Sequence, residues 1–139
     1  LELAKLKLPR KLDSAAQERI KARILAFAGT PYDLYVDADD ESVDLMETVE
    51  NILESAGWKL QPTKASVRYG TKAGLTATSG VVLEMLKAKR DTLGPALLAL
   101  ASALRDEGLL DVRASEHAIG ATDKHADAIH VIIGRKPIK

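Results

Sequence analysis

Three histidines are the residues in this chain best suited to acid–base or metal chemistry. They are His117, His125 and His130, and the carboxylates of Asp123 and Asp127 stand among them. Imidazole and carboxylate groups together bind transition metals or transfer protons near neutral pH. No two of these histidines have the i, i+4 spacing of a helical zinc site, so the spacing gives little support to a metal. His117, Asp123 and His125 are the weak candidates for metal ligands, and the alternative is two surface histidines and one strand histidine.

A glycine-rich stretch is the second candidate, because backbone amides, a hydroxyl and an ammonium can together hold a phosphate. These groups occur in Gly70-Thr71-Lys72-Ala73-Gly74. The stretch has neither the residue order of a P-loop nor the Gly-x-Gly-x-x-Gly order of a dinucleotide site. Residues 63–80 as a whole are rich in threonine, serine and glycine, which predicts a long connecting loop.

Charged residues at the ends of predicted strands are the third candidate. Asp37 and Asp39 lie at the carboxyl end of the first predicted strand, and Lys87, Lys89 and Arg90 follow the third. Ligands of open parallel sheets bind beyond the carboxyl ends of the strands. If these side chains face one crevice, they are tentative ligand-binding residues for a polar molecule. The alternative is that the second aspartate caps a helix and that the basic residues form a solvated turn.

Two further features offer less chemistry. Gly134-Arg135-Lys136-Pro137 follows the last predicted strand, where it either docks an anion or ends the strand and keeps it soluble. The chain has no Gly-x-Ser-x-Gly elbow and no cysteine. A serine elbow and a thiol nucleophile therefore have no support. We predict no catalytic residues and no cofactor.

The elements that must position these groups alternate between helical and strand patterns. Apolar residues at helical spacing predict helices over residues 14–28, 39–56 and 93–107, and the first begins with a capping box made by Ser14 and Gln17. Runs of strand-forming residues predict strands over 32–37, 58–60, 81–86, 110–114 and 128–134. The apolar run at 81–86 is expected to be buried on both faces, and a short helix is its alternative.

A repeat organises these elements, since the order helix, glycine, strand occurs around both Gly57 and Gly108. Two βαβ units joined by the 63–80 stretch would produce it. We therefore predict an α/β fold of three layers, with a mostly parallel sheet of about five strands and an additional N-terminal helix. Residues 1–11 are expected to be a linker or a remnant of a trimmed chain, and residues 12–139 a single domain.

Composition disfavours several classes of protein. The 139 residues contain 20 Lys plus Arg and 20 Asp plus Glu, and a net charge of zero argues against a nucleic-acid binder. The lack of cysteine fits a reducing compartment. No apolar run approaches the roughly 20 residues that span a bilayer. Membrane attachment is therefore expected only through sequence upstream of Leu1.

Three short motifs resemble a known type of domain. Phe27-Ala28-Gly29-Thr30-Pro31 ends the first helix, Ala56-Gly57-Trp58 ends the second, and Ile132-Ile133-Gly134-Arg135-Lys136-Pro137 lies near the C-terminus. In this order they resemble the C-terminal soluble domain of uncharacterised bacterial membrane-anchored proteins, over about residues 10–139. The resemblance implies a cytosolic module on a membrane anchor and brings no assigned activity.

We therefore expect a non-catalytic interaction or sensory module of a larger bacterial protein, on the cytoplasmic side and tethered to the inner membrane. Its expected partner is a protein or an upstream domain of the same chain. The first alternative is a small-ligand or nucleotide-binding domain that uses the strand-end crevice. The second alternative is a metal-dependent hydrolase that uses His117, Asp123 and His125.

Overall fold

Helices and strands alternate along the chain in the predicted order. The computed structural model describes residues 10–37, 39–60, 67–69, 79–109, 111–117 and 127–136. The elements in chain order are α2 (Ser14–Ile24), η1 (Leu25–Phe27), β1 (Pro31–Val36), α3 (Asp40–Ser55), β2 (Lys59–Leu60), β3 (Val67–Tyr69), β4 (Val81–Leu86), η3 (Lys87–Lys89), α4 (Arg90–Asp106), β5 (Val112–His117) and β6 (Ile129–Ile133).

The strands form one sheet in the order β2-β1-β6-β4-β5, and β3 also pairs with β1. The β1–β2 and β4–β5 pairs are parallel, and each pair is joined through a helix, α3 or α4. The two predicted βαβ units and the mostly parallel sheet are therefore confirmed. The last strand, β6, lies in the interior of the sheet, parallel to β1 and antiparallel to β4. The two units thus run in opposite directions.

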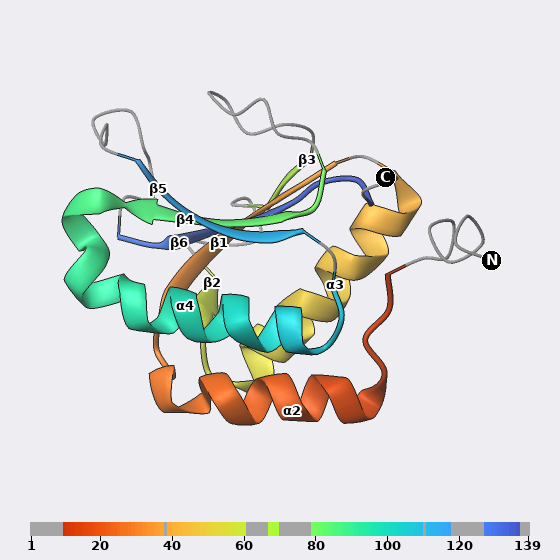
Figure 1. Ribbon diagram of the computed structural model, residues 1–139, viewed down its shortest axis with the longest axis horizontal. Helices are drawn as coiled ribbons and strands as arrows, with labels where there is room; N and C mark the ends of the chain where they lie inside the picture. Colours follow the sequence, from red (N-terminus) through yellow and green to blue (C-terminus); the bar gives the residue numbers. More distant parts are fainter. Residues whose placement is uncertain are drawn as a thin grey trace.

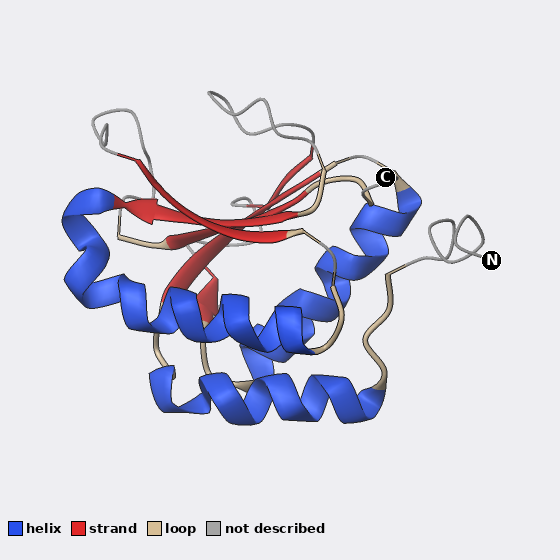
Figure 2. Cartoon of the chain, in the orientation of Figure 1, coloured by secondary structure: helices blue, strands red, loops and turns tan. Residues whose placement is uncertain are grey.

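The three α-helices of the described residues lie on one side of the sheet, as Figures 1 and 2 show. α3 packs on β1 and β6, α4 packs on β4 and β5, and α2 packs on both of these helices. The layers are therefore the sheet, then α3 with α4, then α2. No described helix covers the other face of the sheet.

The core fills the space between the sheet and the helices. Successive strand residues point to opposite faces, and the core takes one set from each long strand, for example Leu34, Leu83 and Val131. The largest fully buried side chains are all Leu or Ile except for Tyr32. This aliphatic core follows from the composition, since only 4% of the chain is aromatic.

The first helix begins differently from its prediction. The predicted capping box of Ser14 and Gln17 is wrong, because the N-cap is Asp13, whose carboxylate accepts from the backbone N–H of Ala16 at 2.8 Å. The Gln17 side chain instead donates to the carbonyl of Leu12 at 2.8 Å. A carboxylate at this position satisfies a free amide and also meets the positive end of the helix dipole, which a hydroxyl does not.

Other elements also differ from the sequence prediction. α4 begins at Arg90, so Pro95 lies inside the helix and not in its first turn. Proline has no N–H, so the carbonyl four residues earlier lacks its helical donor. Because Pro95 is exposed, water can reach that carbonyl instead. β5 begins at Val112, and β3 lies within the predicted 63–80 loop. The six-residue run at 81–86 is a strand, buried throughout, and not a short helix.

Candidate functional site

Three titratable side chains stand in one row across the middle of the sheet. Asp33 of β1 is paired with His130 of β6, and Glu84 of β4 is paired with the same histidine from the other side. We call Asp33, His130 and Glu84 the polar row. On the far side of Glu84, the paired residue of β5 is Ser115. Neighbouring strands lie about 4.8 Å apart, so adjacent members of the row are close enough to interact.

The polar row lies on the sheet face opposite the helices. Leu34, Val131 and Leu83 each follow or precede a member of the row by one residue, and all three belong to the core under the helices. Because side chains alternate along a strand, the row points to the other face. Its members are nevertheless buried, with 0%, 0% and 5% of the residue surface exposed for Asp33, His130 and Glu84.

The best-defined contact in the row joins Asp33 to His130. Oδ1 of Asp33 lies 2.6 Å from Nδ1 of His130, a short distance for this kind of hydrogen bond. The ring of Tyr35 meets the imidazole edge to face, with centroids 6.1 Å apart and planes at 73°. None of these side chains, nor Glu84, is without a partner. The imidazole is therefore held in a single orientation.

This arrangement can bind and release a proton. A carboxylate only accepts hydrogen bonds, so the Nδ1–H of His130 donates to Asp33, and Nε2 is the ring's second proton site. Such a carboxylate–imidazole pair orients histidine in both catalytic and metal sites. Among the residues that the structure describes, however, no three His, Asp or Glu side chains are grouped to hold a metal ion. The row is thus suited to protons and not, on this geometry, to a metal.

The predicted ligand-binding aspartates lie at one end of the sheet. Asp37 follows β1, where its backbone N–H donates to the carbonyl of Ile133 and its carboxylate lies 3.8 Å from Nε of Arg135. Asp39 is the N-cap of α3, and Oδ2 accepts from the N–H of Ser42 at 3.2 Å. The capping role that the sequence offered as an alternative is confirmed.

The predicted basic residues lie at the opposite end. Lys87 and Lys89 form η3 after β4, and Arg90 begins α4. Nζ of Lys89 is 2.7 Å from the carboxylate of Asp127, and the Arg90 guanidinium makes two hydrogen bonds to Glu116. Lys89 and Arg90 therefore pair with carboxylates at their own end of the sheet.

The antiparallel β4–β6 pair keeps the two groups apart. The end of β1 lies beside the beginning of β4, since Val36 and Val81 both pair with Ile133. A six-residue strand is about 20 Å long. The single crevice that was to combine Asp37 and Asp39 with Lys87, Lys89 and Arg90 is therefore not formed, and ligand binding by either group alone stays a prediction.

The other sequence candidates are only partly visible. Asp123, His125 and the Gly70–Gly74 stretch lie outside the described residues, and only the backbone of His117 is described, as the end of β5. Gly134 accepts hydrogen bonds from Arg10 and Ser42 at its carbonyl. That carbonyl thus ties the end of β6 to the start of α3.

The sequence contains a signal for the polar row. Asp33, Glu84 and His130 each interrupt a strand that is otherwise largely apolar. His130 was interpreted as an ordinary strand histidine, and Asp33 and Glu84 were not selected. One titratable residue in the centre of a buried strand has to be hydrogen-bonded or paired. Three such strands would have pointed to a shared cluster.

Comparison with known proteins gives no further guide. No protein-family model, no curated protein and no solved structure matches the chain. Within the described segments, no helix is both long and apolar enough to cross a bilayer. The function has to be inferred from the residues themselves.

Proposed function

We propose that the chain is a non-catalytic sensory module of a larger protein and that it responds to pH through the polar row. The observation that carries the proposal is the buried row itself, in which one imidazole stands between two carboxylates on three adjacent strands. Burying ionisable groups costs stability unless they are paired, so such groups often serve a function. A change of charge on His130 would change the stability of the centre of the sheet.

The burial of His130 favours sensing over catalysis. Histidine is the side chain whose charge ordinarily changes between about pH 5 and 8. A proton can reach a buried ring through small local openings, whereas a substrate needs an accessible one. Asp33 and His130 expose none of their surface. Acid–base catalysis by this pair is therefore less well supported, although its 2.6 Å contact is the kind that catalytic pairs use.

The remaining parts of the proposal rest on the sequence. The resemblance described above implies a module on the cytoplasmic side of a membrane anchor, and we propose that its signal passes to a partner protein or to an upstream domain. The small-ligand alternative has lost its proposed crevice, because its acidic and basic halves lie at opposite ends of the sheet. The hydrolase alternative depends on Asp123 and His125, which lie outside the described residues.

The experiment compares urea unfolding of the wild type and His130→Gln between about pH 5 and 8. Glutamine retains an uncharged N–H donor in the side chain, but it cannot titrate in this range. We expect the wild-type free energy of unfolding to change with pH and the variant to lose that change. One proton taken up or released on unfolding corresponds to about 1.4 kcal/mol per pH unit.

A matched control removes the other two histidines. In the variant His117→Gln/His125→Gln, His130 is the one histidine left, and we expect it to keep the wild-type pH dependence. If the pH dependence disappears in this control and persists in His130→Gln, the proposal is wrong. Should His130→Gln fail to fold, Asp33→Asn tests the same pair, and an unchanged pH profile there would also count against the proposal.

A further inference from the structure

β5 is an edge strand of the sheet, and no described strand lies beyond it. On its inner side, the carbonyl of Asp111 accepts a hydrogen bond from the N–H of Val81 in β4. The backbone groups of successive residues in a strand turn to its two sides in alternation. Val112, Ala114 and Glu116 therefore turn their N–H and carbonyl groups away from β4. An open edge of this kind can pair with another strand.

α4 borders this open edge, because it packs on both β4 and β5 (Figure 1). Near the end of α4, Nε of Arg105 donates to the outward carbonyl of Val112 at 2.9 Å. At the start of α4, the Arg90 guanidinium makes two hydrogen bonds to Glu116. These contacts join the two ends of the helix to the two ends of the strand. The middle of α4, at Leu98, is therefore level with the middle of β5.

An exposed stripe of α4 lies beside the same edge. Asp91, Leu98 and Arg105 follow each other at intervals of seven residues, close to two helical turns, so they share one side of the helix. All three are exposed. Leu98 is 59% exposed and, with Leu25, is one of two exposed large apolar side chains among the described residues. A single exposed leucine is common, but this one stands midway between two opposite charges.

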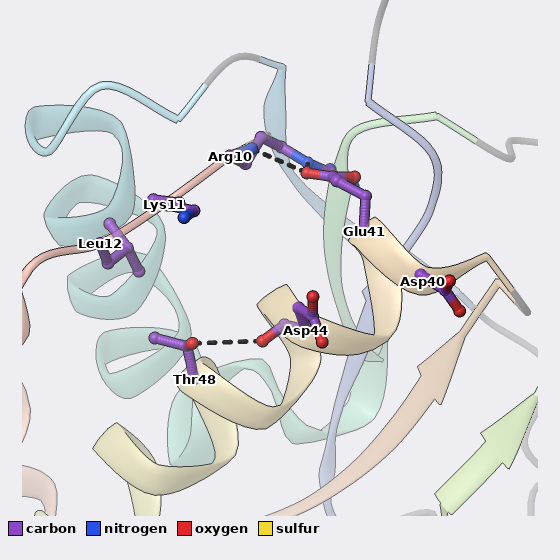
Figure 3. A pocket seen from close by; sticks show the side chains of 7 residues that line it. All are labelled: Arg10, Lys11, Leu12, Asp40, Glu41, Asp44 and Thr48. Carbon is purple, nitrogen blue, oxygen red and sulfur yellow. Dashed lines mark hydrogen bonds and ion pairs between the residues drawn. The ribbon is translucent and has the colours of Figure 1, made fainter. Parts of the chain in front are cut away.

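Other charges of the helical layer are paired within the chain. Arg19 of α2 binds Glu107 of α4. In the cavity beside the start of α3, Arg10 binds Glu41 (Figure 3). The two charged ends of the α4 stripe, by contrast, form no ion pair with any residue that the structure describes. Their charges can therefore bind a partner.

The stripe and the edge are both self-complementary about one two-fold axis. If a second copy is rotated by half a turn about an axis at Leu98, its Asp91 meets Arg105 of the first copy and its Arg105 meets Asp91. The same rotation sets the two β5 strands antiparallel, with Ala114 opposite Ala114 and their outward backbone groups hydrogen-bonded to each other. Paired strands lie about 4.8 Å apart, so two α4 helices that each cover β4 and β5 would lie about 10 Å apart, a distance at which helices pack.

We propose that two copies of this chain associate through β5 and α4 into a symmetric dimer with one continuous sheet. The edge strands supply backbone hydrogen bonds, the two Leu98 side chains pack on each other at the axis, and an Asp91–Arg105 ion pair forms at each end. The contact is small, so the dimer is weak and dissociates at the low protein concentrations of unfolding experiments. This inference is independent of the pH response proposed for the polar row.

The first test measures the mass of the particle by sedimentation equilibrium at increasing protein concentration. We expect the wild type to change from one chain to two as the concentration approaches about 1 mM, the range of weak association. Ala114→Pro removes an N–H that points away from β4, so it should keep the fold and lose the dimer. The control Ala114→Ser keeps that N–H and should associate like the wild type. Thermal unfolding at low concentration confirms that each variant is folded.

Charge reversal tests the register of the two helices. Asp91→Arg alone sets like charges against each other at both ends of the dimer, and so does Arg105→Asp alone. Each should therefore associate at least about fivefold more weakly than the wild type. Mixed together, the two variants should form a heterodimer, because the arginine introduced at position 91 then meets the aspartate introduced at position 105. Native mass spectrometry separates the heterodimer from both homodimers. The control Glu47→Arg reverses an exposed carboxylate of α3 and should associate like the wild type.

Several results would overturn the proposal. One is a wild type that stays monomeric at every concentration, and another is a folded Ala114→Pro variant that dimerises as well as the wild type. A mixture of Asp91→Arg and Arg105→Asp without a heterodimer would exclude the antiparallel helix pair. An equal loss in Glu47→Arg would show that only net charge matters. If Ala114→Pro does not fold, the heterodimer experiment decides the question.

Discussion

Replacing Gly80 by alanine should destabilise the domain much more than the same replacement at Gly108. Both glycines have positive φ, +77° at Gly80 and +89° at Gly108, where an alanine costs about 1–2 kcal/mol. At Gly108 an added Cβ would meet nothing within 4 Å. At Gly80 it would lie 2.4 Å from the backbone oxygen of Asp111 and 2.7 Å from its Oδ2.

The clash at Gly80 involves backbone that cannot easily move. The Asp111 carbonyl accepts a hydrogen bond from the N–H of Val81 at 3.0 Å, at the start of the β4–β5 pair. The N–H of Gly80 donates to the carbonyl of Arg135, and the carbonyl of Gly80 accepts from the N–H of Gly134, each at 2.8 Å. Forcing extra volume into such a site costs about 1–3 kcal/mol. Together with the cost of an alanine at positive φ, Gly80→Ala should lower the free energy of unfolding by about 2–5 kcal/mol. Gly108→Ala should lower it by about 1–2 kcal/mol, from the positive φ alone.

The assay is urea unfolding of both variants and the wild type, followed by circular dichroism and by Trp58 fluorescence. The difference between the two variants isolates the contact with Asp111, because the backbone term is common to both. If the two free energies of unfolding agree within about 0.5 kcal/mol, the close approach of Gly80 to Asp111 is not present in solution and the reasoning fails.

Two other predictions test the helical layer and the Arg10 contact. In urea unfolding, Leu97→Ala should cost about 2–5 kcal/mol and Leu98→Ala no more than about 0.5 kcal/mol. The reason is that Leu97 is 1% exposed and Leu98 is 59% exposed. Similar costs for the two variants would refute the orientation of α4. Burial acts to raise the pKa of Glu41, but hydrogen bonds from Arg10 outweigh it and the net pKa is lowered. The stability that Glu41 contributes is therefore present above its ordinary pKa of 4.5 and is lost as the pH falls through its lowered pKa. Acid unfolding curves of wild type and Glu41→Gln should accordingly converge as the pH falls through the lowered pKa of Glu41, and curves that stay parallel would contradict this linkage.

Much of the local structure could be predicted because its causes lie within a few residues of chain. The apolar spacing predicted the three α-helices that the described residues form, and Asp39 was named as a possible cap of the second. Even locally, neighbouring candidates compete, so Asp13 caps α2 where Ser14 was expected. The start of α4 was missed because the prediction took Pro95 as a mark of the first turn.

The candidate sites were harder to predict, because each depends on residues far apart in sequence. The strand-end crevice failed although Asp37 and Lys87 do follow strands, since β6 is inserted between β1 and β4 and runs antiparallel to β4. Arg10 was assigned to a linker, yet it is buried against Glu41 and the carbonyl of Gly134. No pattern around residue 10 contains its partners.

By itself, the sequence determined the α/β class, the two βαβ units, the aliphatic core and the absence of thiol chemistry. These follow from composition and from periodicities that each segment carries alone. Only the tertiary structure decided that Asp33, His130 and Glu84 form one row and that Arg10 joins α3 to β6. Strand order and direction are set by which apolar faces bury each other across long stretches of chain, and a period of two is the same whichever neighbour a strand takes.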